Sequence, residues 1–360
     1  MKQFRIIMAA ALALLSAIPV SAQQAVELKQ QSLGSLGIGS ANYSGITPLG
    51  NNRYAVVSDK EPADGFFIME MGQDPTSGQI SYANLVGFYQ NPSPETDANG
   101  MSIRDCEGIV YHNASNTVFI SGEGDQEILE YSMEGHPTGR KLTIPAIFAL
   151  RNIVPNYGFE ALGYDKKNGL FWTTTESTLL ADGACASPEH PNNQNFLRLQ
   201  SFGEDLLPKA QYAYRMDRGR SEDFGKTYVY GVPAITALQN GKLLILEREA
   251  NISNGYLSST VRCKLFLVDP NTGWQIDSST DLKKLDPNRF LIKTLLADFT
   301  TKLTPFNLSF ANYEGMCLGR KLSDGRQTII MISDSQNGFG IGPVKLKDYV
   351  KVLVLPDEVM

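Results

Sequence analysis

The chain has 360 residues, of which 42% are hydrophobic and 19% charged, and its formal net charge at pH 7 is −6. This is the composition of a folded protein, and the acidic balance argues against a nucleic-acid partner, since phosphate backbones require clustered Lys and Arg. A small anionic or phosphorylated substrate stays compatible with it, because a local basic spot is enough to bind one.

The first segment is typical of a secretory signal peptide. Lys2 and Arg5 precede an apolar run over residues 6–15, and the segment ends on Val20-Ser21-Ala22. A basic start, a short apolar stretch and a small-x-small ending define such a peptide, and the run is too short to span a bilayer. We therefore expect residues 1–22 to be removed and residues 23–360 to form a single domain. The protein would be exported, either periplasmic or secreted, without a transmembrane segment.

Five hairpin units recur along the rest of the chain. Each is a strand, a tight polar turn and a second strand that ends in an acidic residue. Turns such as Asn240-Gly241 and Asp324-Gly325 are strong hairpin signals, because both central residues of the turn need a positive φ. The units start near Ser44, Glu107, Glu160, Ala234 and Glu314, and they end near Asp59, Glu123, Glu176, Glu249 and Asp334.

Further strands follow each hairpin, and four-stranded units that recur in this way are propeller blades. The sequence therefore predicts an all-β fold, a β-propeller of five blades closed by strands from both chain ends. A sixth, degenerate blade in residues 177–230 or 270–300 and a large β-sandwich are the alternatives. The expected outer pairs are 65–71 with 80–89, 127–133 with 140–144, 195–201 with 210–216, 264–268 with a partner beyond the turn at 269–273, and 350–355 with 26–32.

The acidic hairpin ends should gather carboxylates at one mouth of the central channel. The start of a first strand neighbours the end of the second, so Glu107 should lie beside Glu123, and Glu160 beside Glu176. Glu314 and Asp334 would pair in the same way, as would Ser44 and Asp59. In the fourth unit Pro233 holds the first position, while Glu247 and Glu249 offer acids at the second.

So many carboxylates raise one another's pKa, which calls for neutralisation. A hard cation such as Ca²⁺ would bind through oxygen ligands, or Arg and backbone N–H groups would satisfy the acids. The alternative is a purely structural role, in which each Glu hydrogen-bonds the next blade.

Two arginines are candidates to bind an anionic substrate. Arg248 lies between Glu247 and Glu249, so in a strand its side chain points away from both and it pairs within the blade wall. Arg215 belongs to a basic segment after a strand, and Arg gives bidentate contacts to phosphate. A solvated loop is the alternative for that segment.

The four cysteines match no zinc motif. In an oxidising compartment Cys185, in a polar loop, is the first candidate for a disulfide, with Cys263 as one partner to consider. Cys106 and Cys317 lie beside Glu-Gly turns, where a second disulfide and buried free thiols are equally compatible with the sequence.

Four short motifs occur in a fixed order along the chain. They are Asp105-Cys106-Glu107-Gly108-Ile109, Gly158-Phe159-Glu160-Ala161-Leu162, Leu246-Glu247-Arg248-Glu249, and Asn312-Tyr313-Glu314-Gly315-Met316 followed by Ile332-Ser333-Asp334-Ser335. In these motifs the chain resembles the phytase-like domain family, described as having an esterase-like activity of phytase, over about residues 40–356. The resemblance implies a propeller with recurring acidic residues and a phosphoester hydrolase activity.

Under that resemblance the acids divide into two roles. Glu107, Glu160 and Glu314 are expected to be metal ligands or water-orienting groups, and Ca²⁺ is the expected ion. The expected catalytic set is Asp59, Glu247, Glu249 and Asp334, with Asp59 or Asp334 as the general base.

The function expected is therefore that of an exported, metal-dependent hydrolase of phosphoric esters. Two alternatives stay open at this point. One is a non-catalytic propeller that binds a small ligand or a protein at the acidic mouth. The other is a metal-centred propeller enzyme that acts on a lactone or a sugar.

Overall fold

Nearly all regular structure in the described part of the chain is β-strand, joined by turns and short 3₁₀ segments. The structure is a computed structural model that describes residues 24–223, 225–339 and 345–359. The expected signal peptide, residues 1–22, lies outside the described residues and stays a prediction. In the described ranges no helix is both long enough and apolar enough to cross a membrane.

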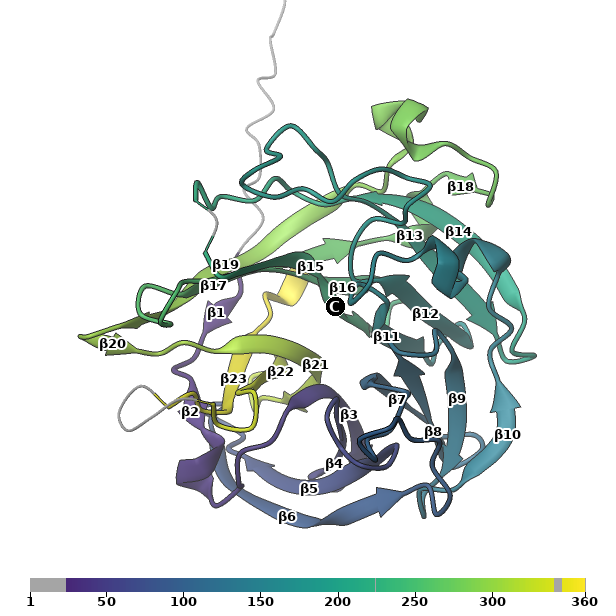
Figure 1. The fold of residues 1–360 in the computed structure, drawn as a ribbon. Helices are drawn as coiled ribbons and strands as arrows, with labels where there is room; N and C mark the ends of the chain where they lie inside the picture. The colour runs from purple at the N-terminus through teal and green to yellow at the C-terminus, as the bar shows by residue number, and fades with distance from the viewer. Residues whose placement is uncertain (1–23, 224, 340–344, 360) are drawn as a thin grey trace, which may run out of the picture.

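The strands form five antiparallel sheets arranged in a ring (Figure 1). The first two sheets each have four strands. Blade 1 comprises β3 (Tyr43–Gly50), β4 (Arg53–Ser58), β5 (Gly65–Gln73) and β6 (Ile80–Gln90). Blade 2 comprises β7 (Cys106–His112), β8 (Thr117–Gly122), β9 (Ile128–Ser132) and β10 (Pro137–Lys141).

Two-residue strands extend the other three sheets. Blade 3 comprises β11 (Phe159–Asp165), β12 (Leu170–Thr175), β13 (Phe196–Gly203), β14 (Pro208–Arg215) and β18 (Gln275–Ile276). Blade 4 comprises β15 (Thr227–Ala237), β16 (Leu243–Ile252), β17 (Thr260–Val268), β19 (Lys293–Thr304) and β20 (Asn307–Leu308). Blade 5 comprises β21 (Asn312–Lys321), β22 (Gln327–Asp334), β23 (Tyr349–Val354), β1 (Val26–Glu27) and β2 (Gln31–Ser32).

The first strands of the five blades surround the central channel. β3 contacts β7, β7 contacts β11, β11 contacts β15, β15 contacts β21, and β21 returns to β3. This closed circuit confirms a five-bladed propeller. The expected closure by both chain ends is also confirmed, because β1 and β2 pair with β23 at the outer edge of blade 5.

The two stretches considered for a sixth blade belong to the five. Residues 177–230 hold β13, β14 and the start of β15, and residues 270–300 hold β18 and most of β19. The strand after the turn at 269–273 is β18, which joins β14 of blade 3, so the partner of β17 is the later strand β19. In blade 2 the outer strand β10 ends at Lys141, whereas we expected it over 140–144.

The hydrophobic core is divided among the interfaces between blades. Five clusters of buried apolar residues each draw on two neighbouring blades around the ring. Phe119 of blade 2, for example, packs in one cluster with Phe159 and Phe171 of blade 3. Blade-to-blade packing therefore supplies most of the apolar burial that holds the ring together.

The four cysteines are free thiols, so the disulfide between Cys185 and Cys263 was wrong. Cys263 is fully buried on β17 in the core between blades 4 and 5. Cys185 lies in the loop between β12 and β13 of blade 3, where Ser177 Oγ lies 3.3 Å from its sulfur. Cys106 and Cys317 are buried free thiols and do not form the second disulfide that was the alternative for them.

A β-bulge opens the inner hairpin of every blade. The register between first and second strand shifts at Ser44, at Glu107-Gly108, at Glu160, at Val232-Pro233 and at Glu314. A bulge inserts an extra residue and re-aims its side chain. Three of the five bulges carry the Glu of a sequence motif, so the repeat fixes where these carboxylates point.

Glycine next to the bulge lets neighbouring blades approach closely. A Cβ on Gly108 would lie 2.4 Å from the carbonyl oxygen of Glu160 on the next blade, and one on Gly45 would lie 2.3 Å from that of Glu107. Both distances are too short for a side chain. The Gly of the Glu-Gly motif therefore allows the blades to pack closely, while the Glu places its carboxylate at the channel mouth.

Candidate functional site

A cavity of about 540 Å³ opens where the inner strands begin. Eight carboxyl groups and three cationic side chains line it. The acids are Asp59, Asp105, Glu107, Glu123, Glu160, Glu176, Glu314 and Asp334, and the cations are Lys60, Lys226 and Arg248. Seven of these acids were expected at one mouth of the channel from the hairpin repeat, and the structure brings all seven together.

The first acidic triplet consists of Asp59, Asp105 and Glu107, whose ligand atoms all lie within 4.8 Å of one another. The Lys60 ammonium lies 2.9 Å from Asp59 and 2.8 Å from Asp105. Asp59 Oδ1 is buried and has no hydrogen-bond partner among the described residues. Burial, followed by the charges of Glu160 and Asp59, raises the pKa of Glu107 well above its ordinary value.

The second acidic triplet consists of Glu123, Glu160 and Glu176. The backbone N–H of Gly158 donates to Glu123 at 2.9 Å, yet burial raises the pKa of Glu123 to about 7. Glu160 Oε2 is buried without a hydrogen-bond partner in the described chain. Burial and the adjacent Glu176 raise the pKa of Glu160 well above its ordinary value.

The triplets form between blades, which differs in part from the pairing we expected. Glu107 groups with Asp59 of blade 1, and Glu123 of its own hairpin groups with Glu160 of blade 3. The bulge is the physical reason, because it shifts the register beside Glu107 and turns the carboxylate toward the neighbouring blade. Glu160 and Glu176 do lie together, as the hairpin geometry predicts.

Arg248 lines the cavity and is not confined to the blade wall. Its guanidinium donates to Glu176 on one side and to Glu314 on the other, and it lies 3.8 Å from Glu160 Oε2. Asn312 fixes this arrangement, since its Oδ1 accepts from Arg248 at 3.1 Å while its Nδ2 donates to Glu314 at 2.7 Å. One buried cation thus compensates carboxylates from blades 3 and 5.

Asp334 lies at the edge of the cavity, at the end of β22. The backbone N–H of Gln336 donates to it at 2.6 Å. Burial, followed by the charge of Asp59, raises the pKa of Asp334 to about 7. Asp334 and Asp59, both expected in the catalytic set, therefore line the same cavity.

Glu247 and Glu249 do not belong to the acidic ring, so their expected position was wrong. Side chains alternate along β16, and Arg248 takes the face toward the channel. Glu247 accepts a hydrogen bond from Tyr214 at 2.7 Å, while the backbone N–H groups of Arg220 and Ser221 donate to Glu249 at 2.9 and 2.8 Å. Both carboxylates anchor the segment that follows β14.

Arg215 lies outside the cavity, which corrects its expected place in substrate binding. It is exposed at the end of β14, and its guanidinium stacks over the ring of Phe290 with 5.6 Å to the centroid. The preceding residue Tyr214 turns inward to Glu247, so strand alternation sends Arg215 outward.

Three polar residues of the site were not assigned a role from the sequence. Asp105 precedes the bulge with a φ of +51°, Asn312 precedes Glu314 by two residues, and Lys60 follows Asp59 directly. Asp105 and Asn312 each lie two residues before the Glu of a Glu-Gly pair, within two of the four sequence motifs. That shared position could have identified them as residues of the site.

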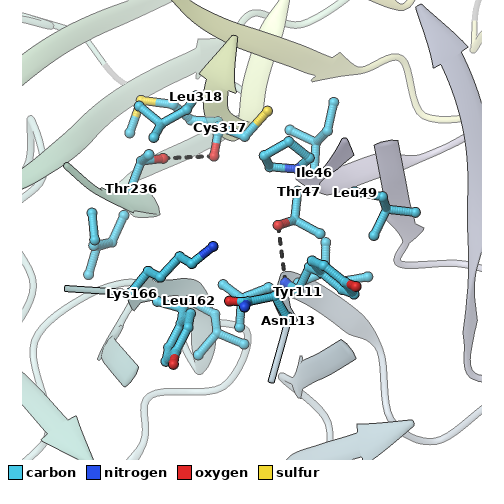
Figure 2. A pocket seen from close by; sticks show the side chains of 18 of the residues that line it. Ile46, Thr47, Leu49, Tyr111, Asn113, Leu162, Lys166, Thr236, Cys317 and Leu318 are labelled. Carbon is cyan, nitrogen blue, oxygen red and sulfur yellow. Dashed lines mark hydrogen bonds between the residues drawn. The ribbon is translucent and has the colours of Figure 1, made fainter. Parts of the chain in front are cut away.

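The opposite mouth of the channel has a different chemistry (Figure 2). A pocket of about 430 Å³ lies further along the same inner strands, and most of its lining is apolar, such as Ile46, Leu162 and Leu318. Thr47 Oγ1 accepts from the N–H of Tyr111 at 3.1 Å, and Lys166 is the one charged residue among the described residues that line it. The acidic mouth is therefore the candidate site for chemistry on polar bonds.

The acidic cavity fits a hard divalent cation. Its donors are carboxylate oxygens, and buried oxygens of Asp59 and Glu160 have no hydrogen-bond partner within the described residues. Both carboxylates lie near a cationic side chain, Lys60 and Arg248 respectively, but a buried oxygen without a hydrogen bond is costly unless a further cation or a proton satisfies it. The two triplets supply several such oxygens at ligand spacing, which is the environment that Ca²⁺ prefers.

Comparison with known proteins places the chain in a family context. A family model described as "Phytase-like: Esterase-like activity of phytase" matches residues 38–336. No curated protein matches the chain.

Several solved structures are similar in arrangement at low sequence identity. An endo-arabinase from Bacteroides thetaiotaomicron is 12% identical, with 89% of this chain and 95% of that chain covered and a TM-score of 0.44. The PQQ-bound aldose sugar dehydrogenase from Streptomyces coelicolor is 11% identical, with 91% and 98% covered and a TM-score of 0.38. The catalytic domain of an α-L-arabinofuranosidase from Coprinopsis cinerea is 11% identical, with 94% and 98% covered and a TM-score of 0.42.

Proposed function

The chain belongs to the phytase-like family, and from that premise we propose that it is an exported, metal-dependent hydrolase of phosphoric esters. One observation carries the proposal. The cavity at the acidic mouth holds eight carboxyl groups, and buried oxygens of Asp59 and Glu160 lack a hydrogen-bond partner in the described chain. Such a donor set suits a hard cation, and a phosphate group is a natural further ligand for that cation.

Asp59, Asp105 and Glu107 would hold the cation, and the charge of Glu160 acts on Glu107 from the second triplet. When bound, a divalent cation such as Ca²⁺ polarises a phosphoryl oxygen and lowers the pKa of a coordinated water. Each triplet already contacts one cationic side chain, Lys60 in the first and Arg248 in the second. The first triplet is the better of the two, because the Lys60 side chain is 52% exposed and a metal ion could displace it into solvent, whereas Arg248 is buried.

The remaining residues have positioning and proton-transfer roles in this proposal. Arg248 keeps Glu176 and Glu314 in place by donating to both, and so shapes the floor of the cavity. Asp334, held by the backbone N–H of Gln336, would accept a proton from the attacking water. Export rests on the basic and apolar character of residues 1–22.

Hydrolysis of 4-nitrophenyl phosphate in the presence of Ca²⁺ tests the proposal. We expect Glu107→Gln to reduce kcat/KM by about a hundredfold or more, since metal ligands and their supports carry effects of that size. Glu134→Gln, an exposed residue in the turn between β9 and β10, is the matched control and should keep wild-type activity.

Thermal unfolding of both variants shows whether the fold is intact. If the wild-type protein hydrolyses no phosphoric ester with Ca²⁺, Mg²⁺ or Mn²⁺, the proposal fails. A propeller that only binds its ligand would then be the better interpretation.

A further inference from the structure

The cavity at the acidic mouth has a second, apolar wall. Blades 1, 2, 3 and 5 contribute the carboxyl groups, whereas β15, β16 and nearby loops contribute a group of apolar side chains beside the polar Lys226, Thr227 and Arg248. This apolar wall consists of Val229, Ala250, Ile252, Tyr256, Phe310 and Leu346. A ligand in the cavity therefore meets charge on one side and hydrocarbon on the other.

The apolar wall continues onto the surface beside the cavity. The ring of Tyr256 lies against that of Phe339, with 5.1 Å between centroids. Phe339 is 51% exposed, and Leu257 next to Tyr256 is 44% exposed. Exposed apolar side chains that are contiguous with a cavity are typical of a ligand-binding groove.

The cationic side chains of the cavity are already engaged. Lys60 bridges Asp59 and Asp105, and Arg248 is held between Glu176 and Glu314.

Lys226 is the third cation. Its ammonium lies 5.3 Å from the centroid of the Tyr256 ring and 3.3 Å from the tyrosine oxygen. A polyanion such as inositol hexakisphosphate needs several cationic contacts at once, and the protein side of this cavity offers few.

We propose that the substrates of this site are phosphoric monoesters with an apolar alkyl or aryl alcohol group, in preference to polyphosphorylated polyols. The inference rests on the proposed function and narrows its substrate class. The single phosphate group would lie on the acidic side with its cation, and the alcohol group would cover Ile252 and Tyr256. Burial of that apolar group would stabilise the bound substrate and the transition state equally. A longer alkyl group should therefore lower KM and leave kcat nearly unchanged.

Hexyl phosphate and ethyl phosphate form the decisive substrate pair. Their leaving alcohols have similar acidity, so a difference in rate reports contact with the longer chain. With Ca²⁺ present we expect hexyl phosphate to exceed ethyl phosphate by about tenfold or more in kcat/KM, a modest fraction of what full burial of four methylene groups allows. Inositol hexakisphosphate should be slower than hexyl phosphate.

Two variants locate the effect. Tyr256→Ala should bring the hexyl-to-ethyl ratio of kcat/KM close to one. Trp274→Ala removes another large exposed side chain, in the outer part of the molecule away from the cavity, and should keep the wild-type ratio.

The possible failures are distinguishable. A wild-type ratio near one, or inositol hexakisphosphate as the fastest substrate, overturns the inference while phosphoester hydrolysis stands. If no ester is hydrolysed, the proposed function fails, and calorimetric binding of hexylphosphonate against ethylphosphonate with Ca²⁺ decides the inference instead. Equal affinities would then overturn it, and a tighter hexyl compound would support it.

Discussion

At the scale of single residues, Arg248 determines how the buried carboxylates are compensated. It is 3% exposed and contacts Glu176 and Glu314, which come from different blades. Strand alternation predicts that Arg248 faces away from Glu247 and Glu249, and that part is confirmed by the structure. Which of the two faces looks into the channel depends on how β16 packs against β15, and the sequence of β16 contains no information on that.

Replacement of Arg248 should be costly. Arg248→Met leaves Glu176 and Glu314 buried without their cation, so we expect the free energy of unfolding to fall by about 3–5 kcal/mol at neutral pH in the presence of a chelator. Urea denaturation measures this. Arg215→Met, at an exposed strand end, loses only the contact with the Phe290 ring and should change the free energy by about 1 kcal/mol or less. Similar losses in the two variants would contradict the central role of Arg248.

The raised pKa values of the cavity acids predict an unusual pH dependence of stability. Burial raises the pKa of Glu123 from 4.5 to about 7 and that of Asp334 from 3.8 to about 7. At a pH between the unfolded-state pKa and the raised folded-state pKa, the folded state binds more protons than the unfolded state. The stabilisation is therefore complete below the unfolded-state pKa and is lost as the pH rises through the folded-state pKa. Without metal, the temperature at the midpoint of thermal unfolding should therefore decrease as the pH is raised from about 5 to about 8.

Added Ca²⁺ should reduce that fall, because a bound cation replaces the protons as the neutralising charge. Glu123→Gln should reduce the slope in chelator, whereas the exposed Glu134→Gln should not. A midpoint in chelator that stays constant or rises over this pH range would show that the acids are compensated in some other way.

At the scale of elements, the bulged hairpin explains which parts of the site were predictable. The turn signals and acidic strand ends predict the five inner hairpins, and the structure confirms them. The bulge was not predictable from alternation, because an inserted residue leaves both strands with ordinary sequences. It nevertheless decides that Glu107 groups with Asp59 of the preceding blade.

The Gly of the Glu-Gly motif should tolerate no side chain. In Gly108→Ala the new Cβ would meet the Glu160 carbonyl oxygen at 2.4 Å, and backbone cannot move away as a flexible side chain can. We expect a loss of about 1–3 kcal/mol in unfolding free energy, the usual cost of overpacking.

Gly39→Ala is the matched control for this substitution. No atom lies within 4 Å of a Cβ at Gly39, so its effect should stay within about 0.5 kcal/mol. If Gly108→Ala is as stable as the control, the blades are less tightly apposed at the bulge than the distances indicate.

At the scale of the whole molecule, the ring is a set of blades that stabilise one another in pairs. Each main core cluster draws on two neighbouring blades, so no blade buries its apolar faces alone. The recurrence of hairpins predicts this architecture and the blade count. The recurrence does not predict that β18 joins blade 3, because a two-residue strand has no periodicity to detect. For the same reason it does not predict that β17 pairs with β19 across a long connection.

Closure of the ring by the N-terminal strands gives the last prediction. β1 and β2 pair with β23 through Val26–Val354 and Gln31–Val350. The backbone N–H of Ala25 donates to the carbonyl oxygen of Leu296 on blade 4 at 2.7 Å. Glu27 forms an ion pair with Lys351 at 2.9 Å. These contacts join the two ends of the chain across the gap that a propeller must close.

A variant that begins at Leu33 loses them, and we expect its free energy of unfolding to fall by about 3–5 kcal/mol, at about 1 kcal/mol for each backbone hydrogen bond or ion pair removed. The exposed edge of β23 would also become free to pair with another chain, so the variant should associate as its concentration rises. A chain that begins at Gln24 keeps every one of these contacts and is the control in urea denaturation and sedimentation. Equal stability of the two chains would mean that blade 5 is held by its packing against blades 1 and 4 alone, with the terminal strands contributing little to closure.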